Sequence, residues 1–245
     1  MTETVKVLIA IQARSNSTRF PQKIYQIIGR KMVIHHVLDQ AKSAKTYVER
    51  SSHKKAIKCD VAILYPQDDK QVVSSCRSAC NLLIEADTND DNDVLSRYVK
   101  AIEITKSDYI VRLTSDCPLL LDFIISKHIN TAVLNDLDYV SNVFPSVRFS
   151  FDGLDVEVIS KRAMMWLKEN ATEKADKEHV TTLLINKMPP EFTYGFVTHK
   201  LDSSTMKLSL DTPEDLENIR KYYHDREHKL SLASKLFGRK NIYEI

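Results

Sequence analysis

The chain has 245 residues, of which 43% are hydrophobic and 28% are charged, and its formal net charge is +2. This is the composition of an ordinary globular protein, and so small a charge predicts neither nucleic acid nor an anionic membrane as a partner. Its longest apolar stretches are only about strand length, and Met1-Thr2-Glu3 lacks the basic and then apolar build of a signal peptide, so we expect a cytoplasmic protein.

Strand and helix patterns alternate along the chain, which indicates an α/β protein with a parallel sheet. The first predicted strand, Val5–Ala13, is nearly all apolar, as a strand buried on both faces should be. The best supported helix is Asp93–Lys106, because it has one apolar stripe and Asp93 is a good N-cap. The further predicted strands are Asp60–Tyr65, Leu82–Glu85, Asp108–Leu113, Asp138–Val143, Asp155–Ile159 and Lys207–Leu210. The further predicted helices are Met32–Ala44, part of Asp69–Leu83, Asp122–Leu134, Lys161–Lys168, Lys177–Lys187 and Pro213–His224.

The sequence shows no internal repeat, low-complexity tract or linker, so we expect a single domain over residues 1–245. Within it, Lys45–Lys58 is polar and basic, and we expect an exposed loop or an insertion there. The four cysteines show no CxxC spacing and are expected to stay reduced. Cys76 and Cys80 are four residues apart on a predicted helix, which favours core packing over metal binding.

A cationic loop follows the first predicted strand. Between Thr4 and Leu38 the chain has six cationic residues and no acidic one. Three of these cations fall in QARSNSTRFPQK (Gln12–Lys23), at the strand end where open α/β sheets bind ligands. The loop offers charges, hydroxyl groups and backbone N–H groups that suit a polyphosphate, and the side chains concerned are Arg14, Ser17, Thr18, Arg19 and Lys23. The alternative is an ordinary solvated basic loop.

Three acidic clusters come after this loop, and the first covers residues 85–93. In the second, TSDCPLL, Asp116 follows a predicted strand, and in the third, LSLDTPEDL, Asp211 ends a strand before a helix that begins at Pro213. Two carboxylates at strand ends that face a phosphate loop predict an Mg²⁺ site, because this ion binds one or two carboxylates and phosphate oxygens. The alternatives are structural, with Asp211 as a helix N-cap and Asp116 as a turn residue before Pro118.

The order of the motifs resembles that of a known family. The motifs are QARSNSTRFPQK, DVLSRY, VRLTSDCPLL, DYVSN, DGLDVEV, EHVT and LDTPEDL, which span about residues 5–225. This series resembles the SpsF-type proteins of spore coat polysaccharide biosynthesis, a branch of the cytidylyltransferases that make CMP-activated sugar acids, such as the CMP-Kdo and CMP-sialic acid synthetases. Residues 226–245 find no counterpart and are interpreted as a C-terminal tail.

The resemblance implies a three-layer, Rossmann-like nucleotidyltransferase fold with a mostly parallel central sheet. It implies that the enzyme joins CMP from CTP to an acidic sugar and releases pyrophosphate, for polysaccharide or surface glycan biosynthesis. In such a reaction an acceptor oxygen attacks the α-phosphate of CTP. Mg²⁺ is the implied cofactor and a homodimer the implied assembly.

The resemblance also implies residue roles, motif by motif. The residues implied to bind the phosphates of CTP are Arg14, Ser17, Arg19 and Lys23. The implied Mg²⁺ ligands are Asp116 and Asp211, which with Arg14 and Lys23 are the implied catalytic residues. Candidates near the base or ribose are Asp93 and Arg97, and candidates for acceptor binding are Asp152, Asp155, Glu157 and His179. For His179 a structural role at the start of a helix is the alternative.

Three positions depart from the family pattern, because Asn16, Gln22 and Ser115 stand where relatives usually have glycine. Asn tolerates the left-handed conformation better than most residues. At Gln22 and Ser115 we expect a cost of about 1–2 kcal/mol each, and weaker nucleotide affinity, if those positions require positive φ or close approach of the backbone to phosphate. Two other functions stay open, a glycosyltransferase that binds metal through Asp91-Asn92-Asp93 and a non-catalytic nucleotide-binding protein.

Overall fold

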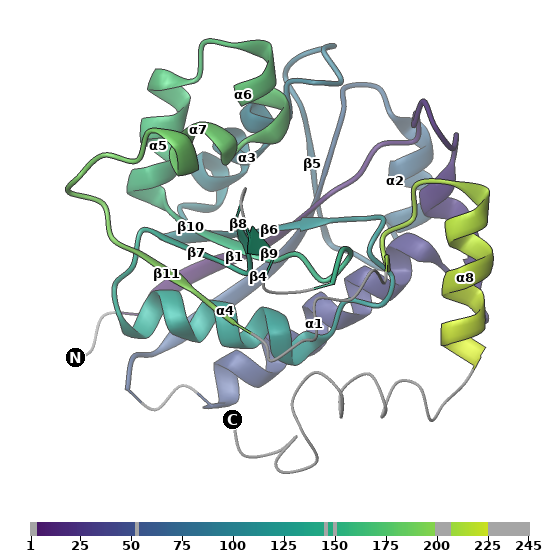
Figure 1. Ribbon diagram of the computed structural model, residues 1–245, viewed down its shortest axis with the longest axis horizontal. Coiled ribbons are helices and arrows are strands. Elements are labelled where there is room, and N and C mark those ends of the chain that lie inside the picture. The colour runs from purple at the N-terminus through teal and green to yellow at the C-terminus, as the bar shows by residue number, and fades with distance from the viewer. Residues whose placement is uncertain (1–3, 52–53, 145–146, 149–150, 199–206, 225–245) are drawn as a thin grey trace.

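A seven-stranded sheet forms the centre of the computed structural model, which describes residues 4–51, 54–144, 147–148, 151–198 and 207–224 (Figure 1). The strand order is β11-β7-β10-β6-β1-β4-β5. Strand β10 is antiparallel to both of its neighbours, and the other pairs are parallel. The strand bounds are β1 Val5–Gln12, β4 Ile57–Tyr65, β5 Leu82–Glu85, β6 Tyr109–Thr114, β7 Tyr139–Ser141, β10 Glu157–Ser160 and β11 Tyr194–Phe196.

Strand β1 lies near the middle of the sheet and is buried on both faces. Val7, Ile9 and Ile11 belong to the core on one face, and Leu8 and Ala10 to the core on the other. Successive side chains of a strand point to opposite faces, so a strand covered on both sides has to be apolar throughout. This explains the unbroken apolar run from Val7 to Ile11.

Helices cover both faces, which confirms the predicted three-layer α/β fold (Figure 1). The helices on the face of Val7 are α1 Val33–Ser51, α2 Lys70–Cys76, α4 Asp122–Leu134 and α8 Pro213–His224. Those on the face of Leu8 are α3 Val94–Thr105, α5 Lys161–Asn170 and α7 Thr182–Asn186, with α6 Lys174–His179 packed on α3. Within the described ranges, no helix combines the length and the apolar character needed to cross a membrane.

Two small hairpins lie outside the main sheet, β2 Ile27–Ile28 with β3 Lys31–Met32, and β8 Val143–Phe144 with β9 Val147–Arg148. A short 3₁₀ helix, η1 Lys23–Tyr25, connects the cationic loop to the first hairpin. Helix α8 holds this hairpin, because Arg220 Nε and Nη2 donate to the carbonyl oxygen of Ile27 at 3.1 and 3.0 Å. The helix that follows Asp211 thus also fixes the segment that follows Lys23.

The expectation of an exposed loop or an insertion at Lys45–Lys58 is wrong for most of that segment. Helix α1 continues through Ser51, and β4 begins at Ile57. Ala44 and Val48 are fully buried, so they extend the apolar stripe of the helix among charged neighbours. Lys45 also pairs with Glu49 one turn later, at 3.0 Å.

Three further expectations differ from the structure. Lys207–Leu210 is not a strand, because Lys207 makes only an isolated bridge to Asp152. The helix expected at Lys177–Lys187 is two short helices, separated at Val180, whose φ is 60°. Strand β11 was not predicted, since it is short and has a glycine at its centre. The four cysteines are buried free thiols, as expected, and the tail at 226–245 lies outside the described residues.

Candidate active site

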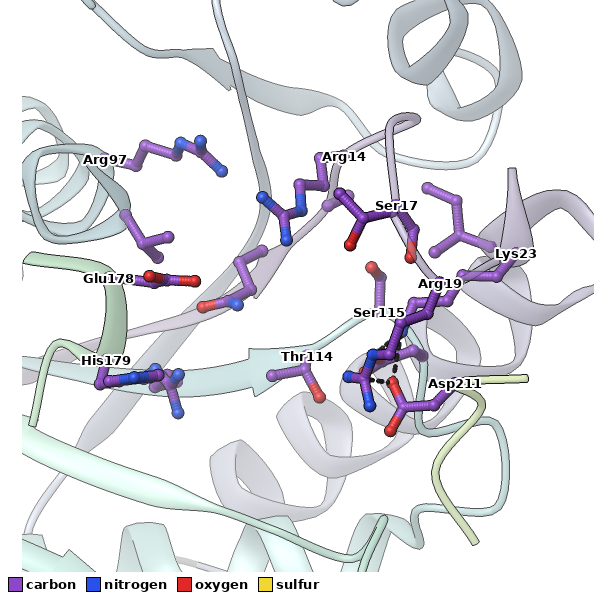
Figure 2. Close-up of a pocket in the computed structure, with 17 residues that line it drawn as sticks. Arg14, Ser17, Arg19, Lys23, Arg97, Thr114, Ser115, Glu178, His179 and Asp211 are labelled. Carbon is purple, nitrogen blue, oxygen red and sulfur yellow. Dashed lines mark hydrogen bonds and ion pairs between the residues drawn. The ribbon is translucent and has the colours of Figure 1, made fainter. Parts of the chain in front are cut away.

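A cavity of about 370 Å³ opens at the carboxyl ends of β1 and β6 (Figure 2). The cationic loop forms one wall with Arg14, Ser17, Thr18, Arg19 and Lys23. Other parts of the wall come from α3, β6 and the turn after it, α6, and the segment before α8; the polar residues that they contribute are Arg97, Arg112, Thr114, Ser115, Asp116, Glu178, His179 and Asp211. The cationic loop and the two acidic segments that the sequence singled out, at Asp116 and Asp211, therefore meet in one place.

The cationic loop is anchored at Ser15. Its backbone N–H and its hydroxyl donate to the two carboxylate oxygens of Asp69, at 2.7 and 2.5 Å, and its Oγ lies 2.6 Å from Tyr25 Oη. The carbonyl oxygen of Ser15 accepts from Gln22 N–H at 3.1 Å, which closes the loop on itself. Asp69 also accepts from Val72 N–H at the start of α2. The loop is thus fixed to the N-terminus of α2, the helix that follows the neighbouring strand β4.

Lys23 lies between the two predicted metal ligands. Its Nζ is 2.6 Å from Asp116 Oδ2 and 3.0 Å from Asp211 Oδ1. Burial alone would lower the pKa of Lys23, but the charge of Asp116 and hydrogen bonds to both carboxylates outweigh it and raise that pKa. Asp211 also pairs with Arg19 at 2.9 Å and with Lys207 at 3.1 Å. Although its burial acts in the opposite direction, the hydrogen bonds from Lys23 and Lys207 lower the pKa of Asp211.

Backbone contacts bring Asp116 and Asp211 together. Leu210 N–H donates to the carbonyl oxygen of Asp116 at 2.9 Å, and Leu208 N–H to that of Asp152 at 2.6 Å. The helix that follows has its own capping box, in which Thr212 Oγ1 accepts from Asp215 N–H and Asp215 accepts from Thr212 N–H. The alternative of Asp211 as the N-cap is therefore wrong, and its carboxylate faces the cavity cations.

The two residues predicted near the base or ribose have different surroundings. Asp93 caps α3 by accepting from Ser96 N–H at 3.1 Å, and it is not among the residues that line the cavity. Arg97 lines the cavity with a side chain that is almost entirely buried. Its Nη2 donates to the carbonyl oxygen of Asp91, and its Nε has no hydrogen-bond partner within the described residues. Burial lowers the pKa of Arg97 from its ordinary value.

Of the four predicted acceptor-binding residues, only His179 lines the cavity. Glu157 is buried in β10, where its carboxylate accepts from Arg112 Nη1 at 2.6 Å and from Tyr139 Oη at 2.5 Å. Asp152 and Asp155 are half-buried, and their charges add to burial and to the charge of Asp116 in raising the pKa of the Cys117 thiol. The cavity lining also includes residues that the sequence did not single out, namely Arg112, Thr114 and Glu178.

One of the three missing glycines has a conformational consequence. Gln22 has φ 58° and ψ 24°, in the left-handed region. Neither Asn16 nor Ser115 is among the described residues with positive φ. The backbone strain that positive φ would cause at Ser115 is therefore absent, and Gln22 is the position where a side chain stands in a conformation that favours glycine.

Two carboxylates, those of Asp116 and Asp211, are groups in this cavity that could bind a metal ion. No group of three or more His, Cys, Asp and Glu that could hold an ion occurs in the described part of the chain. Asp116 and Asp211 nevertheless converge, since both lie within 3.0 Å of the single atom Lys23 Nζ. Such a pair fits Mg²⁺, which completes its shell with water and substrate phosphate oxygens.

The chain matches a protein family model described as cytidylyltransferase over residues 8–242. It is 26% identical over 225 residues to the spore coat polysaccharide biosynthesis protein SpsF of Bacillus subtilis, covering 89% of this chain and 86% of that protein. Among solved structures it is similar to a cytidylyltransferase from Leptospira borgpetersenii, with 24% identity, a TM-score of 0.76 and coverage of 98% and 99% of the two chains. It is also similar to CMP:2-keto-3-deoxy-manno-octonic acid synthetase complexed with CTP, with 16% identity, a TM-score of 0.62 and coverage of 88% and 97%. Since the family model spans nearly its whole length, the chain belongs to the cytidylyltransferase family.

Proposed function

We propose that the protein transfers CMP from CTP to an acidic sugar and releases pyrophosphate. The observation that carries this proposal is the junction of the cationic loop with two carboxylates, in which Lys23 Nζ lies within 3.0 Å of both Asp116 and Asp211. A polyphosphate needs the cations, and a metal that accompanies it needs the carboxylates. The name of SpsF further supports a role in polysaccharide or surface glycan biosynthesis.

The cationic loop is proposed to bind the triphosphate. The side chains for this role are Arg14, Ser17, Arg19 and Lys23, which all line the cavity. Positioning and charge neutralisation are the main contributions that proteins make to phosphoryl-type transfers. Arg14 and Lys23 would stabilise the charge that develops on the leaving pyrophosphate. The anchor at Ser15 keeps the loop in place before the substrate arrives.

Asp116 and Asp211 are proposed to hold Mg²⁺. When bound, this ion supplies Lewis acidity toward phosphate and acceptor oxygens. The two residues contribute ligand charge, and the backbone hydrogen bond from Leu210 to Asp116 sets their separation. Burial acts to raise the pKa of Asp211, but the hydrogen bonds from its lysine partners outweigh it and lower that pKa, so the carboxylate is ionised at neutral pH.

The remaining proposed roles concern the nucleoside and the acceptor. Arg97 presents a buried guanidinium that can donate to base or ribose oxygens, while Asp93 acts indirectly by capping α3. His179 is proposed to contact the acceptor, and Asp152, Asp155 and Glu157 to support that side of the cavity. We also propose that the protein is cytoplasmic and forms a homodimer. Size-exclusion chromatography with light scattering can test the dimer.

The test is a pyrophosphate-release screen of CTP, UTP, ATP and GTP against a panel of sugar acids with Mg²⁺. We expect release that needs CTP, the metal and one class of acid. Asp211→Asn should abolish release. The matched control is Asp39→Asn, which changes an exposed carboxylate paired with Lys31, away from the cavity, and should leave release unchanged. CTP binding without release for any acceptor would contradict the proposal and favour a non-catalytic nucleotide-binding protein.

A further inference from the structure

Arg112 is a charged residue inside the central sheet. It lies in β6 between the buried residues Val111 and Leu113, and only 18% of its side chain is exposed. It also lines the cavity of the candidate active site. Removing a guanidinium from water costs free energy unless its donors are paired, so the partners of Arg112 need to be accounted for.

Glu157 supplies only part of this pairing. The two residues face each other across the antiparallel pair β6 and β10, and Arg112 Nη1 donates to Glu157 Oε2 at 2.6 Å. The other oxygen, Glu157 Oε1, accepts from Tyr139 Oη at 2.5 Å. Because each carboxylate oxygen has a different donor, Glu157 does not pair with the guanidinium through two parallel bonds. Arg112 Nε has no partner among the described residues.

This arrangement keeps Arg112 charged and oriented. Burial would lower the pKa of Arg112, but the charge of Glu157 outweighs it and raises that pKa. Tyr139 fixes Glu157, and Glu157 fixes the guanidinium. A planar guanidinium has five N–H donors, and the hydrogen bond from Nη1 to Glu157 uses one of them, so the group suits an anionic partner with two oxygens, such as a carboxylate.

The position of Arg112 in the cavity indicates which of the two substrates it can bind. Arg112 and Thr114 lie on the same face of β6, and both line the cavity, with Asp116 just beyond the strand end. Figure 2 shows Thr114 between His179 on one side and Asp211 on the other. Within the strand, the backbone from Arg112 to Thr114 spans on the order of 7 Å, a distance that a sugar ring with its substituents can bridge.

The geometry of the reaction also places the acceptor near Arg112. The attacking and leaving oxygens are roughly in line at the reacting phosphorus, so the acceptor lies opposite the leaving pyrophosphate. The cationic loop, with Arg14 and Lys23, is the proposed pyrophosphate side. The part of the cavity lined by Arg112 and Thr114 is then the side on which the acceptor would bind.

We propose that Arg112 binds the acidic group of the acceptor, and that Glu157 and Tyr139 are positioning residues that orient its guanidinium. This inference rests on the proposed function, because it assigns an acceptor subsite within the same cavity. It gives Glu157 an indirect role in place of direct acceptor contact.

The variants are chosen so that the protein still folds. Loss of Arg112 alone would leave Glu157 buried without its cationic partner. We therefore use Arg112→Lys, which keeps the charge but loses the planar fork, and the double variant Arg112→Met/Glu157→Gln, which removes both charges. Tyr139→Phe tests positioning. The matched control is Arg162→Lys, which alters an arginine–carboxylate pair with Asp138 outside the cavity lining.

For each variant the measurements are the KM and kcat for a sugar acid and for its neutral alcohol analogue, and the Kd for CTP by calorimetry. We expect the double variant to raise the KM for the acid roughly 10- to 100-fold, the loss that corresponds to a charge-assisted hydrogen bond. The Kd for CTP and the kinetics of the neutral analogue should stay unchanged, so that the preference for the acid is lost. Arg112→Lys and Tyr139→Phe should give smaller changes in the same direction, and Arg162→Lys none.

An unchanged KM for the acid in the double variant would overturn the inference while the proposed function stands. A weaker Kd for CTP with an unchanged acceptor KM would overturn it too, because Arg112 would then belong to the nucleotide site. An equal rise in KM for the acid and for the neutral analogue would mean that Arg112 does not recognise the charge of the acceptor, and it would also overturn the inference. If the unaltered protein turns over no acid at all, the proposed function fails, and this inference fails with it.

Discussion

Gln22→Gly should stabilise the protein, because Gln22 is held in the left-handed region with φ 58° and ψ 24°. This conformation costs a residue with a Cβ roughly 1–2 kcal/mol, whereas glycine adopts it freely. Glycine loses more chain entropy on folding, which offsets about 0.5–1 kcal/mol of that gain. The side chain of Gln22 is exposed and makes no capping hydrogen bond, so little contact is lost. The expected net gain is about 1 kcal/mol, which for a domain of this size raises Tm by about 2–4 °C.

The assay is urea and thermal unfolding of the unaltered protein and the variant, with CTP affinity measured in parallel. Lys106→Gly is the matched control, since Lys106 has φ 53° and ψ 37° at the end of α3 and does not line the cavity. Both variants should be more stable, and only Gln22→Gly should change CTP affinity, by a modest factor, because Gln22 belongs to the cationic loop that is proposed to bind the triphosphate. A Gln22→Gly protein less stable than the unaltered one would refute the strain argument.

The remaining predictions concern charge. Arg14→Ala and Lys23→Ala should each weaken CTP binding by about 1.5–3 kcal/mol in calorimetry, and unchanged affinity in a folded Arg14→Ala protein would exclude the loop from the site. Asp116→Asn and Asp211→Asn should keep the circular dichroism spectrum but lose metal-dependent turnover, whereas full activity in either would disprove its role as a ligand. Although burial acts in the opposite direction, a hydrogen bond from Lys207 and those from two backbone N–H groups lower the pKa of Asp215. The stability that Asp215 contributes is therefore present above its unfolded pKa of about 3.9 and is lost as pH falls through the lower folded value. Urea midpoints should thus fall less steeply with acid below about pH 4 in Asp215→Asn, and identical slopes would count against this linkage.

The sequence predicts those parts of the site that depend on position along single strands. Arg14 and Lys23 follow the first strand, and Asp116 follows β6, so the rule that ligands gather at strand ends is sufficient to find them. Arg112 was not found, because its significance comes from Glu157, 45 residues away on an antiparallel strand. No local pattern marks that pairing.

Local patterns also fail where tertiary contacts set the backbone. The segment before Asp211 reads as a strand, but its N–H groups bond to Asp116 and Asp152 instead of a ladder. The expected helix at Lys177–Lys187 is interrupted at Val180, which has positive φ and is fully buried. A buried β-branched residue gives no sign of such a break in sequence.

The central claim is that an acceptor oxygen attacks the α-phosphate of CTP in this cavity. The most direct measurement follows the label from CTP carrying ³²P at the α position or at the γ position, with an active sugar acid and Mg²⁺. The account predicts that the α label appears in a CMP-linked acid and the γ label in pyrophosphate, in equal amounts, and that Asp211→Asn forms neither. Pyrophosphate without a CMP-linked product, or no label transfer to any acid while CTP is bound, would contradict it.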